Sequence, residues 1–537
     1  MPAHVPTEGI QTATSSRISI YLYWAIPLIL AAMVGAFSID GHFVQDDKAA
    51  IVLSPLVVKE AIPFSEFFHR DFWGNPTEKG VVSWRPLLPM IWRTLWAIRP
   101  GAPLQFHLLT FLLHLVTTGV VFLLGRHLFQ EREIPWAAAV LFAVHPVHAE
   151  ALGEIVSQAD ILATVFGLLA VYIAVRYEDR TIIPFLVPVL LVMACLAKES
   201  AVIFSAAIAV AALLPPHVQL RKRLSISFWA ALVTVLTILV QLSFKRTAEN
   251  PADNIAFVAH GIQRTLHALY IVGRAVGMCF VPIGMSPFHD YAAIDLSVAT
   301  LLPYAIPGVL FLCIGFGGLW IALKKRSIAG VVLIGLLLGP IVLNSSLFVR
   351  VGTELAERLL YPASVAASMM AAFLVYRVIG FRAGRVVIVV LILFFSIQSW
   401  SAQRPWRNQL ALYAYGVQAE PLSAKLRVYY GNDLLSKGDV LPAAWHFMAA
   451  TYIKMNFPNP VDPIPIIQLE QMPIEQRIME APALFAPDDP GRFLDNYSRF
   501  LNSRKPGLAQ YMRDFFTKHY REMDNGSDQV SPAQQEN

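Results

Sequence analysis

The chain has 537 residues, of which 56% are hydrophobic and only 15% are charged, whereas an average soluble domain has about 25% charged residues. This composition excludes an ordinary soluble protein and indicates that a lipid bilayer is the main solvent. The formal net charge of +5 does not indicate nucleic-acid binding, because the basic residues form short clusters between apolar segments. The three cysteines are far apart, with no spacing typical of a metal or redox site.

Eleven apolar segments are long enough, or nearly so, to cross a hydrocarbon core of about 30 Å. The first, at 18–37, is too long for the apolar part of a signal peptide, so we expect a transmembrane helix after a cytoplasmic tail at 1–17. The others lie at 106–125, 136–156, 160–175, 182–197, 201–214, 226–244, 301–323, 328–348, 361–377 and 386–402. The sequence therefore predicts an all-α polytopic membrane domain over 18–402.

A twelfth segment, from Arg264 to Val281, carries two arginines and a histidine, which are costly at bilayer depth. We expect an amphipathic helix at the membrane interface there. With eleven crossings and a cytoplasmic N-terminus, the positive-inside rule is obeyed. The cytoplasmic basic clusters are those at 126–132, 176–180, 221–223, 324–326 and 377–385, and the extracytoplasmic regions are 38–105, 245–300 and 403–537.

The C-terminal region at 403–522 is expected to be a small helical domain outside the membrane. Gly431, Ala443, Phe447 and Ala450 match the small and aromatic positions of one tetratricopeptide repeat, with Pro458 beyond them. Residues 523–537 contain little apolar material and are expected to be a disordered tail.

The acidic pair Asp46 and Asp47 follows the first predicted helix by about nine residues, in the first extracytoplasmic loop at 38–105. Two adjacent carboxylates near a low-dielectric boundary repel each other, so one of them can hold its proton more tightly and act as a general base. The alternative is a turn rich in aspartate that caps the next helix.

Further ionisable residues fall on the same side. His145, His148 and Glu150 could ligate a metal, or the two histidines could form local hydrogen bonds at the interface. Lys198 and Arg358 could hold a phosphate, or form interfacial ion pairs. Together these residues favour a functional site, because ionisable clusters far apart in the sequence all fall on one side of the membrane, under a topology that other residues determine. The remaining ionisable residues on that side are Glu154, Asp160, Glu199, Glu354 and Glu357.

Short strings between about residues 36 and 450 match a known family, and they are Phe43 to Ile51, Trp84 to Leu87, Phe106-His107 with His114, Leu141 to Glu150, Ala159 to Ala163, Leu196 to Glu199, Val351 to Thr353, Ala356 to Tyr361, and Arg407-Asn408. In these strings the chain resembles the membrane-embedded glycosyltransferases of the GT-C superfamily, which use polyprenyl-phosphate sugars. It is most similar to the transmembrane, tetratricopeptide-containing O-mannosyltransferases. Where this family usually has Gly-Arg, the chain has Ser157 and Gln158.

The resemblance implies an inverting transfer of a sugar, expected to be mannose, from a polyprenyl-phosphate carrier to an extracytoplasmic hydroxyl, expected to be a protein serine or threonine. It implies that Asp46 is the general base and that Asp47 orients it. Phosphate leaves without protonation at neutral pH, so neither a metal nor another cofactor is required. The donor phosphate would be held by Lys198, Arg358 and Arg85, and the substrates by His145, His148, Glu150, Asp160, Glu199, Glu357 and Tyr361.

Two other functions remain open from the sequence. The same fold could transfer another sugar to a glycolipid or an envelope polysaccharide, or the chain could be a secondary transporter. The compact chain favours a bacterial cytoplasmic membrane, with the site facing outward.

Overall fold

The computed structural model describes residues 25–59, 62–76, 83–177, 180–243, 259–287, 297–348, 352–456 and 461–527, with side chains as far as residue 518. In these ranges the chain is helical, and the one β feature is an isolated bridge between Arg70 and Pro76. The chain divides into two compact units, which are described separately. The first comprises Met1–Pro287 and Ser297–Leu412, and the second comprises Phe288–Leu296 and Tyr413–Asn537.

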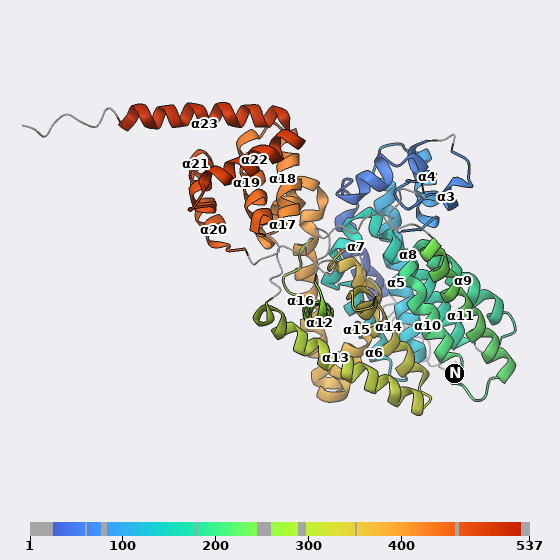
Figure 1. Ribbon diagram of the computed structural model, residues 1–537. Helices are drawn as coiled ribbons and strands as arrows, with labels where there is room; N and C mark the ends of the chain where they lie inside the picture. Colours follow the sequence, from blue (N-terminus) through green and yellow to red (C-terminus); the bar gives the residue numbers. More distant parts are fainter. Residues whose placement is uncertain are drawn as a thin grey trace, which may run out of the picture. The chain divides into compact units, whose positions relative to one another are not determined.

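The first unit is a helical bundle in which α5, α6, α8 and α15 pack on one another (Figure 1). Short 3₁₀ helices precede several of the long ones. The main helices are Ala25–Ser38, α2 (Pro55–Val58), α3 (Glu66–His69), α4 (Leu87–Ile98), α5 (Leu104–Leu128), α6 (Glu133–Ala143), α7 (Ala149–Gly153), α8 (Gln158–Arg176), α9 (Ile183–Ala197), α10 (Val202–Ala211), α11 (Leu220–Ser243), α12 (Gly261–Phe280), α13 (Val298–Lys324), α14 (Ile328–Asn344), α15 (Tyr361–Ile379) and α16 (Phe381–Gln403).

Within the described residues, six helices are long and apolar enough to cross a membrane, which identifies a multi-pass membrane protein. They are α5, α8 with the 3₁₀ turn before it, α11, α13, α15 with its preceding turn, and α16 with the turn after it. Six shorter apolar helices accompany them. Each of the eleven predicted segments overlaps one of these twelve helices, but the number of crossings stays a prediction.

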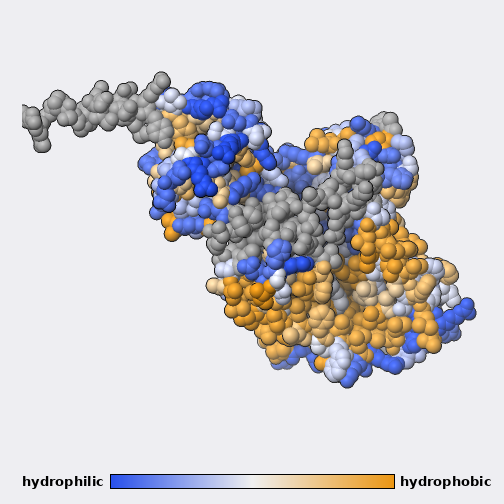
Figure 2. Space-filling model, viewed as in Figure 1, coloured by the Kyte–Doolittle hydropathy of each residue, from blue (hydrophilic) through white to orange (hydrophobic). Residues whose placement is uncertain are grey.

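The six long helices differ sharply in burial. The most apolar windows of α8 and α15 are each 72% buried, whereas those of α11 and α13 are only 17% and 11% buried. The exposed side chains of α13 include Ile314, Phe316 and Trp320, and Figure 2 shows a broad hydrophobic surface over this part of the unit. A bundle with a packed centre and an apolar outer surface is suited to lipid, with α8 and α15 at its core.

The prediction of one continuous apolar segment over 136–156 is wrong. Helix α6 ends at Ala143, because Pro146 lacks a backbone N–H and forces the preceding His145 into an extended conformation. The short α7 then ends at Gly153, and Glu154 is extended again before α8 begins. These breaks place His148 at the end of a 3₁₀ turn, Glu150 in the short α7 and Glu154 in the extended link after it, rather than along one continuous helix.

Helix α12 corresponds to the twelfth segment and is amphipathic, with one side packed on α13. A Cβ at Gly273 would lie 1.9 Å from the carbonyl oxygen of Tyr304, so the two helices approach at this glycine. Helix α12 has 20 residues, which is long enough for a membrane span, but its composition does not place it among the candidate spans. Its position at the membrane interface stays a prediction.

The second unit contains seven helices in its described part, the first of which begins at the end of the preceding unit. Helices α18 and α19 form an antiparallel pair at the predicted repeat, and Gly431 packs directly against the ring of Phe447. Pro458 lies outside the described residues. The helices are α17 (Gln409–Ala419), α18 (Ala424–Ser436), α19 (Val440–Asn456), α20 (Ile464–Glu470), α21 (Ile474–Phe485), α22 (Pro490–Arg504) and α23 (Pro506–Ser527).

The predicted start of the disordered tail, at residue 523, is wrong. Helix α23 continues to Ser527, so the first five residues of that stretch belong to the helix. A helix that has already formed can extend through polar residues, since each added residue contributes a backbone hydrogen bond. Residues 528–537 lie outside the described part of the chain.

Candidate active site

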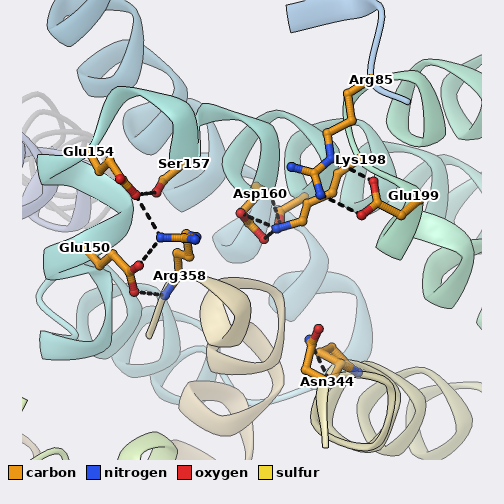
Figure 3. A network of polar contacts seen from close by, with 11 residues as sticks. Arg85, Glu150, Glu154, Ser157, Asp160, Lys198, Glu199, Asn344 and Arg358 are labelled. Carbon is orange, nitrogen blue, oxygen red and sulfur yellow. Dashed lines mark hydrogen bonds and ion pairs between the residues drawn. The ribbon is translucent and has the colours of Figure 1, made fainter. Parts of the chain in front are cut away.

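Charged side chains from distant parts of the first unit form one network at a common end of the bundle (Figure 3). The first turn of α8 contributes Asp160, the 3₁₀ turn before α15 contributes Arg358, and the turn between α9 and α10 contributes Lys198 and Glu199. The remaining members are Arg85, before α4, Glu150 in α7, and Glu154 directly after α7. The convergence predicted from the topology is therefore observed for these residues.

Arg358 joins the two glutamates of the α7 region. Its backbone N–H donates to Glu150 Oε2 over 2.9 Å, and its Nη1 donates to Glu150 Oε1 and, over 2.8 Å, to Glu154 Oε2. Ser157 Oγ also donates to Glu154 Oε2, over 3.3 Å. The Nη2 and Nε groups of Arg358 donate no hydrogen bond within the described part, and 20% of the side chain is exposed. These two N–H groups thus remain available to donate to an anion.

Lys198 and Arg85 make two further ion pairs in the network. Lys198 Nζ lies 2.6 Å from both carboxylate oxygens of Asp160, in an almost fully buried pair. Arg85 donates from Nε and Nη2 to Glu199 over 2.7 and 2.6 Å, and this pair is more exposed. The Nη1 group of Arg85 makes no hydrogen bond within the described ranges. Arg85 can therefore bind an anion while it remains paired, whereas Lys198 is largely committed to Asp160.

Asp46 and Asp47 differ in their surroundings. Asp47 is fully buried and accepts hydrogen bonds from the N–H groups of Val44, over 3.1 Å, and Val156, over 2.9 Å. Burial nevertheless raises the pKa of Asp47 to about 7, against the opposite effect of these donors. Asp46 is half-buried, and its carboxylate makes no hydrogen bond in the described part. It is close enough to Arg358 and Glu154 to interact with both electrostatically.

The backbone around the acidic pair explains this difference. Gln45 has a left-handed φ of 45°, which is uncommon for a residue other than glycine. The turn follows four residues without regular secondary structure, and Asp47 closes it by accepting a hydrogen bond from the N–H of Val44. Its second hydrogen bond, to Val156, ties the loop to the turn before α8. Asp47 therefore fixes the position of its neighbour Asp46.

Glu154 adds a third carboxylate to this acidic group. Burial raises the pKa of Glu154 well above its usual range, Arg358 opposes this, and Asp46, Asp47 and Glu150 reinforce it. The sequence shows Glu154 as one acidic residue among several, and its contact with Arg358 depends on a residue more than 200 positions away. Glu154 was not among the residues to which the sequence assigned a role.

His145, His148 and Tyr361 were predicted to bind substrate, but their described contacts are internal. His145 Nε2 lies 3.0 Å from the carbonyl oxygen of Cys279, and its Nδ1 accepts from the N–H of Val147. His148 Nε2 lies 2.8 Å from Ser364 Oγ, and its ring centre lies 4.5 Å from that of Tyr361. The described residues contain no cluster of three or more metal-ligating side chains. These contacts favour a packing role for the two histidines over a metal site.

Two more carboxylates hold the segment before Arg358. Glu354 pairs with His267 of α12 over 2.5 Å, and Glu357 Oε1 accepts the N–H of Ser286 over 2.7 Å. Glu357 therefore helps to position the backbone here, and the substrate contact predicted for it stays a prediction. His267 was noted in the sequence only as a costly polar residue, and its pairing was not predicted.

Gln158 stands at a position where the chain differs from the family pattern, and its side chain links three helices by hydrogen bonds. Its Oε1 accepts from Trp92 Nε1 over 2.8 Å, and its Nε2 donates to the carbonyl oxygen of Phe106 and to Thr110 Oγ1. The side chain is fully buried. It stabilises the packing of α4 and α5 on α8 rather than reaching toward a ligand.

Known proteins are similar in sequence to this chain over about three quarters of its length. A protein O-mannosyl-transferase of Caenorhabditis elegans is 26% identical over 422 residues, which covers 74% of this chain and 58% of the relative. The human protein O-mannosyl-transferase TMTC1 is 27% identical over 474 residues, which covers 77% of this chain and 53% of the human protein. This chain is a homologue of the protein O-mannosyl-transferases. The resemblance seen in the sequence is confirmed.

The similarity to these homologues is locally stronger. The Drosophila melanogaster protein O-mannosyl-transferase Tmtc2 is 40% identical over 143 residues, which cover 26% of this chain. No protein-family model matches the chain. The chain spans about half the length of the curated relatives it matches.

Proposed function

We propose that this chain is an inverting glycosyltransferase that moves mannose from a polyprenyl-phosphate carrier to serine or threonine hydroxyls of an extracytoplasmic protein. The network of carboxylates and cations at one end of an apolar bundle carries the proposal. A lipid-linked donor keeps its tail in the bilayer while its head reaches such a network. Homology to proteins named protein O-mannosyl-transferases supports the choice of sugar and acceptor.

Asp46 is the general base in this proposal. Its carboxylate is partly exposed and has no hydrogen-bond donor among the described residues, so it can accept a proton from an incoming hydroxyl. The hydroxyl oxygen forms a bond to the anomeric carbon as the bond from that carbon to the phosphate oxygen breaks. The phosphate leaves with the bonding electrons, and Asp46 keeps the proton.

Arg358 and Arg85 bind the departing phosphate. Each keeps guanidinium N–H groups that its carboxylate partners do not use, at 20% and 17% side-chain exposure. A cation stabilises this step because negative charge grows on the phosphate in the transition state. Lys198 acts at longer range, since its ammonium is bound by both oxygens of Asp160.

Asp47 and Glu150 position the reacting groups. Asp47 holds the loop that carries Asp46, and Glu150 holds both the backbone and the guanidinium of Arg358. Neither a metal nor another cofactor has a required role in this proposal. An outward-facing site in a bacterial cytoplasmic membrane, inferred from the sequence, belongs to the same proposal.

The test uses the full chain, purified in detergent, with a synthetic polyprenyl-phosphate mannose and a peptide rich in serine and threonine. Mass spectrometry measures the hexose added to the peptide. We expect transfer by the wild type and a loss of about 100-fold or more in Asp46→Asn, since general-base catalysis contributes about 10²–10⁴-fold. Inversion is checked by the anomeric configuration of the product.

Asp40→Asn is the matched control. Asp40 lies in the same loop, 64% of its side chain is exposed, and it pairs with Arg407 over 3.1 Å. We expect its activity to stay within about twofold of the wild type, because an exposed ion pair contributes little. Full activity in Asp46→Asn would refute the assignment of the base, and transfer of hexose to an added glycolipid but not to the peptide would refute the protein acceptor.

A further inference from the structure

A basic hollow in the second unit has no role in the proposed chemistry. Its volume is about 310 Å³, and it is lined by Val428 and Asn432 of α18, by Phe500 and Arg504 of α22, and by Lys505. This volume is at the lower end of the range of about 300–1,000 Å³ that is typical of ligand pockets. The hollow is therefore suited to a few residues of an extended chain rather than to a large cofactor.

The lining has an excess of positive charge. Arg504 and Lys505 are its charged residues, and Lys454 of α19 lies nearby, with its Nζ 5.9 Å from the ring centre of Phe500. The guanidinium of Arg504 also lies 5.9 Å from that ring centre. Burial and Arg504 together lower the pKa of Lys454. No ion pair to any of these three cations occurs among the described side chains, so an anionic ligand would relieve their repulsion.

Asn432 indicates that a ligand of this hollow should also supply a hydrogen-bond donor. Its Oδ1 atom is buried and has no hydrogen-bond donor in the described part of the chain. A buried acceptor without a donor is costly, so a ligand that supplies an N–H group gains affinity there. Val428 and Phe500 provide apolar contacts on the same lining.

We propose that this hollow binds an acidic peptide segment of another protein in an extended conformation. Such a segment supplies carboxylates for Arg504, Lys505 and Lys454, backbone N–H groups for Asn432, and methylene groups for Phe500 and Val428. A phosphodiester headgroup supplies acceptors but no donor at its phosphate, so it leaves the Asn432 carbonyl unsatisfied. The proposal is independent of sugar transfer.

The test measures binding to the full chain in detergent by fluorescence anisotropy. The probe is a labelled ten-residue peptide that alternates glutamate and glycine, and it has no side-chain hydroxyl that could act as a sugar acceptor. A peptide that alternates lysine and glycine is the matched probe. We expect saturable binding of the acidic peptide alone, with displacement by the unlabelled acidic peptide.

The variant pair Arg504→Gln with Lys505→Gln should weaken binding by at least about tenfold, because two charge-assisted hydrogen bonds are lost. Asn432→Leu should weaken it by about threefold to tenfold. The matched control is Arg492→Gln with Arg499→Gln, which removes the same charge from exposed positions of α22 outside the lining. We expect this control to change binding by less than about twofold, and all variants to keep the wild-type melting temperature.

Three results would overturn the proposal. One is an equal loss of binding in the control pair, which would indicate attraction to the overall charge alone. Another is equal binding of the lysine peptide, or no saturable binding of either peptide. The third is binding of short-chain phosphatidylserine without binding of the acidic peptide, which would assign the hollow to a lipid headgroup.

Discussion

The ammonium group of Lys198 lies 2.6 Å from both carboxylate oxygens of Asp160, and less than a tenth of either side chain is exposed. Removing one member leaves the other charge buried without its partner, which typically costs about 3–5 kcal/mol. We therefore expect Lys198→Met to lower the free energy of unfolding by about this amount. Thermal unfolding in detergent provides the measurement.

The double variant Lys198→Met with Asp160→Leu is the control, because it removes both charges. We expect it to recover most of the stability lost in the single variant, since replacing a buried ion pair by apolar residues is often close to neutral. A double variant as unstable as Lys198→Met would contradict a purely electrostatic origin of the loss.

Asp47 should make the stability of the protein depend on pH. Burial raises its pKa from 3.8 to about 7, so the folded chain holds this proton more tightly than the unfolded chain. The resulting stabilisation is complete below pH 3.8 and is lost as the pH rises to about 7. We expect the melting temperature to fall between about pH 4.5 and 7 for this reason.

Asp47→Asn isolates this contribution, because the amide does not titrate and keeps a similar shape. The difference in melting temperature between wild type and variant should change across the same pH range and become constant above about pH 8. A difference that is independent of pH would show that Asp47 is ionised throughout.

The sequence predicted which charged residues meet, but not how they pair. The topology brings Asp160, Lys198 and Arg358 to one side because each follows or precedes an apolar helix, and hydropathy alone reveals this. The partners are separated by more than 200 residues in the case of Arg358 and Glu154. Such contacts depend on helix packing, which hydropathy does not encode.

Errors in the helix boundaries have a local cause. The segment at 136–156 is apolar on average, and such an average hides the break that Pro146 imposes on His145. Helix α4 was missed because its twelve residues are too few to register as a membrane span. The helix pair of α18 and α19 was predicted correctly, because small and aromatic residues recur there at fixed spacings.

Gly431 tests the packing of that helix pair. A Cβ at this position would lie 2.9 Å from Cε1 of Phe447 and 3.2 Å from the carbonyl oxygen of Ala443. We expect Gly431→Ala to lower the free energy of unfolding by about 1–3 kcal/mol, because the added methyl group overpacks the contact. Chemical denaturation of the full chain, followed by tyrosine or tryptophan fluorescence, measures the change.

Gly507→Ala is the matched substitution. Gly507 lies near the start of α23, and a Cβ there meets no atom within 4 Å. We expect this variant to be neutral or slightly stabilising, by up to about 1 kcal/mol, because alanine favours a helix more than glycine does. Equal destabilisation by both substitutions would show that the loss at Gly431 does not come from Phe447.

The contact between His267 and Glu354 should control the position of Arg358. The two side chains are almost fully buried, and their atoms Nε2 and Oε1 lie 2.5 Å apart. With the hydrogen bond from Ser286 to Glu357, this contact fixes both ends of a short segment directly before Arg358. We expect Glu354→Gln and His267→Asn each to raise the KM for the lipid donor more than they lower kcat, because a misplaced Arg358 binds the donor phosphate less tightly.

A double-mutant cycle separates this role from a general loss of stability. If the two residues act through their mutual contact, the double variant should be no worse than the more damaging single variant, with a coupling energy of about 0.5–3 kcal/mol in both unfolding and donor binding. Glu133→Gln is the control, since Glu133 forms a longer and more exposed pair with Arg385, over 3.3 Å. Fully additive effects of the two substitutions would show that His267 and Glu354 act independently of each other, and an unchanged KM would show that their contact does not reach Arg358.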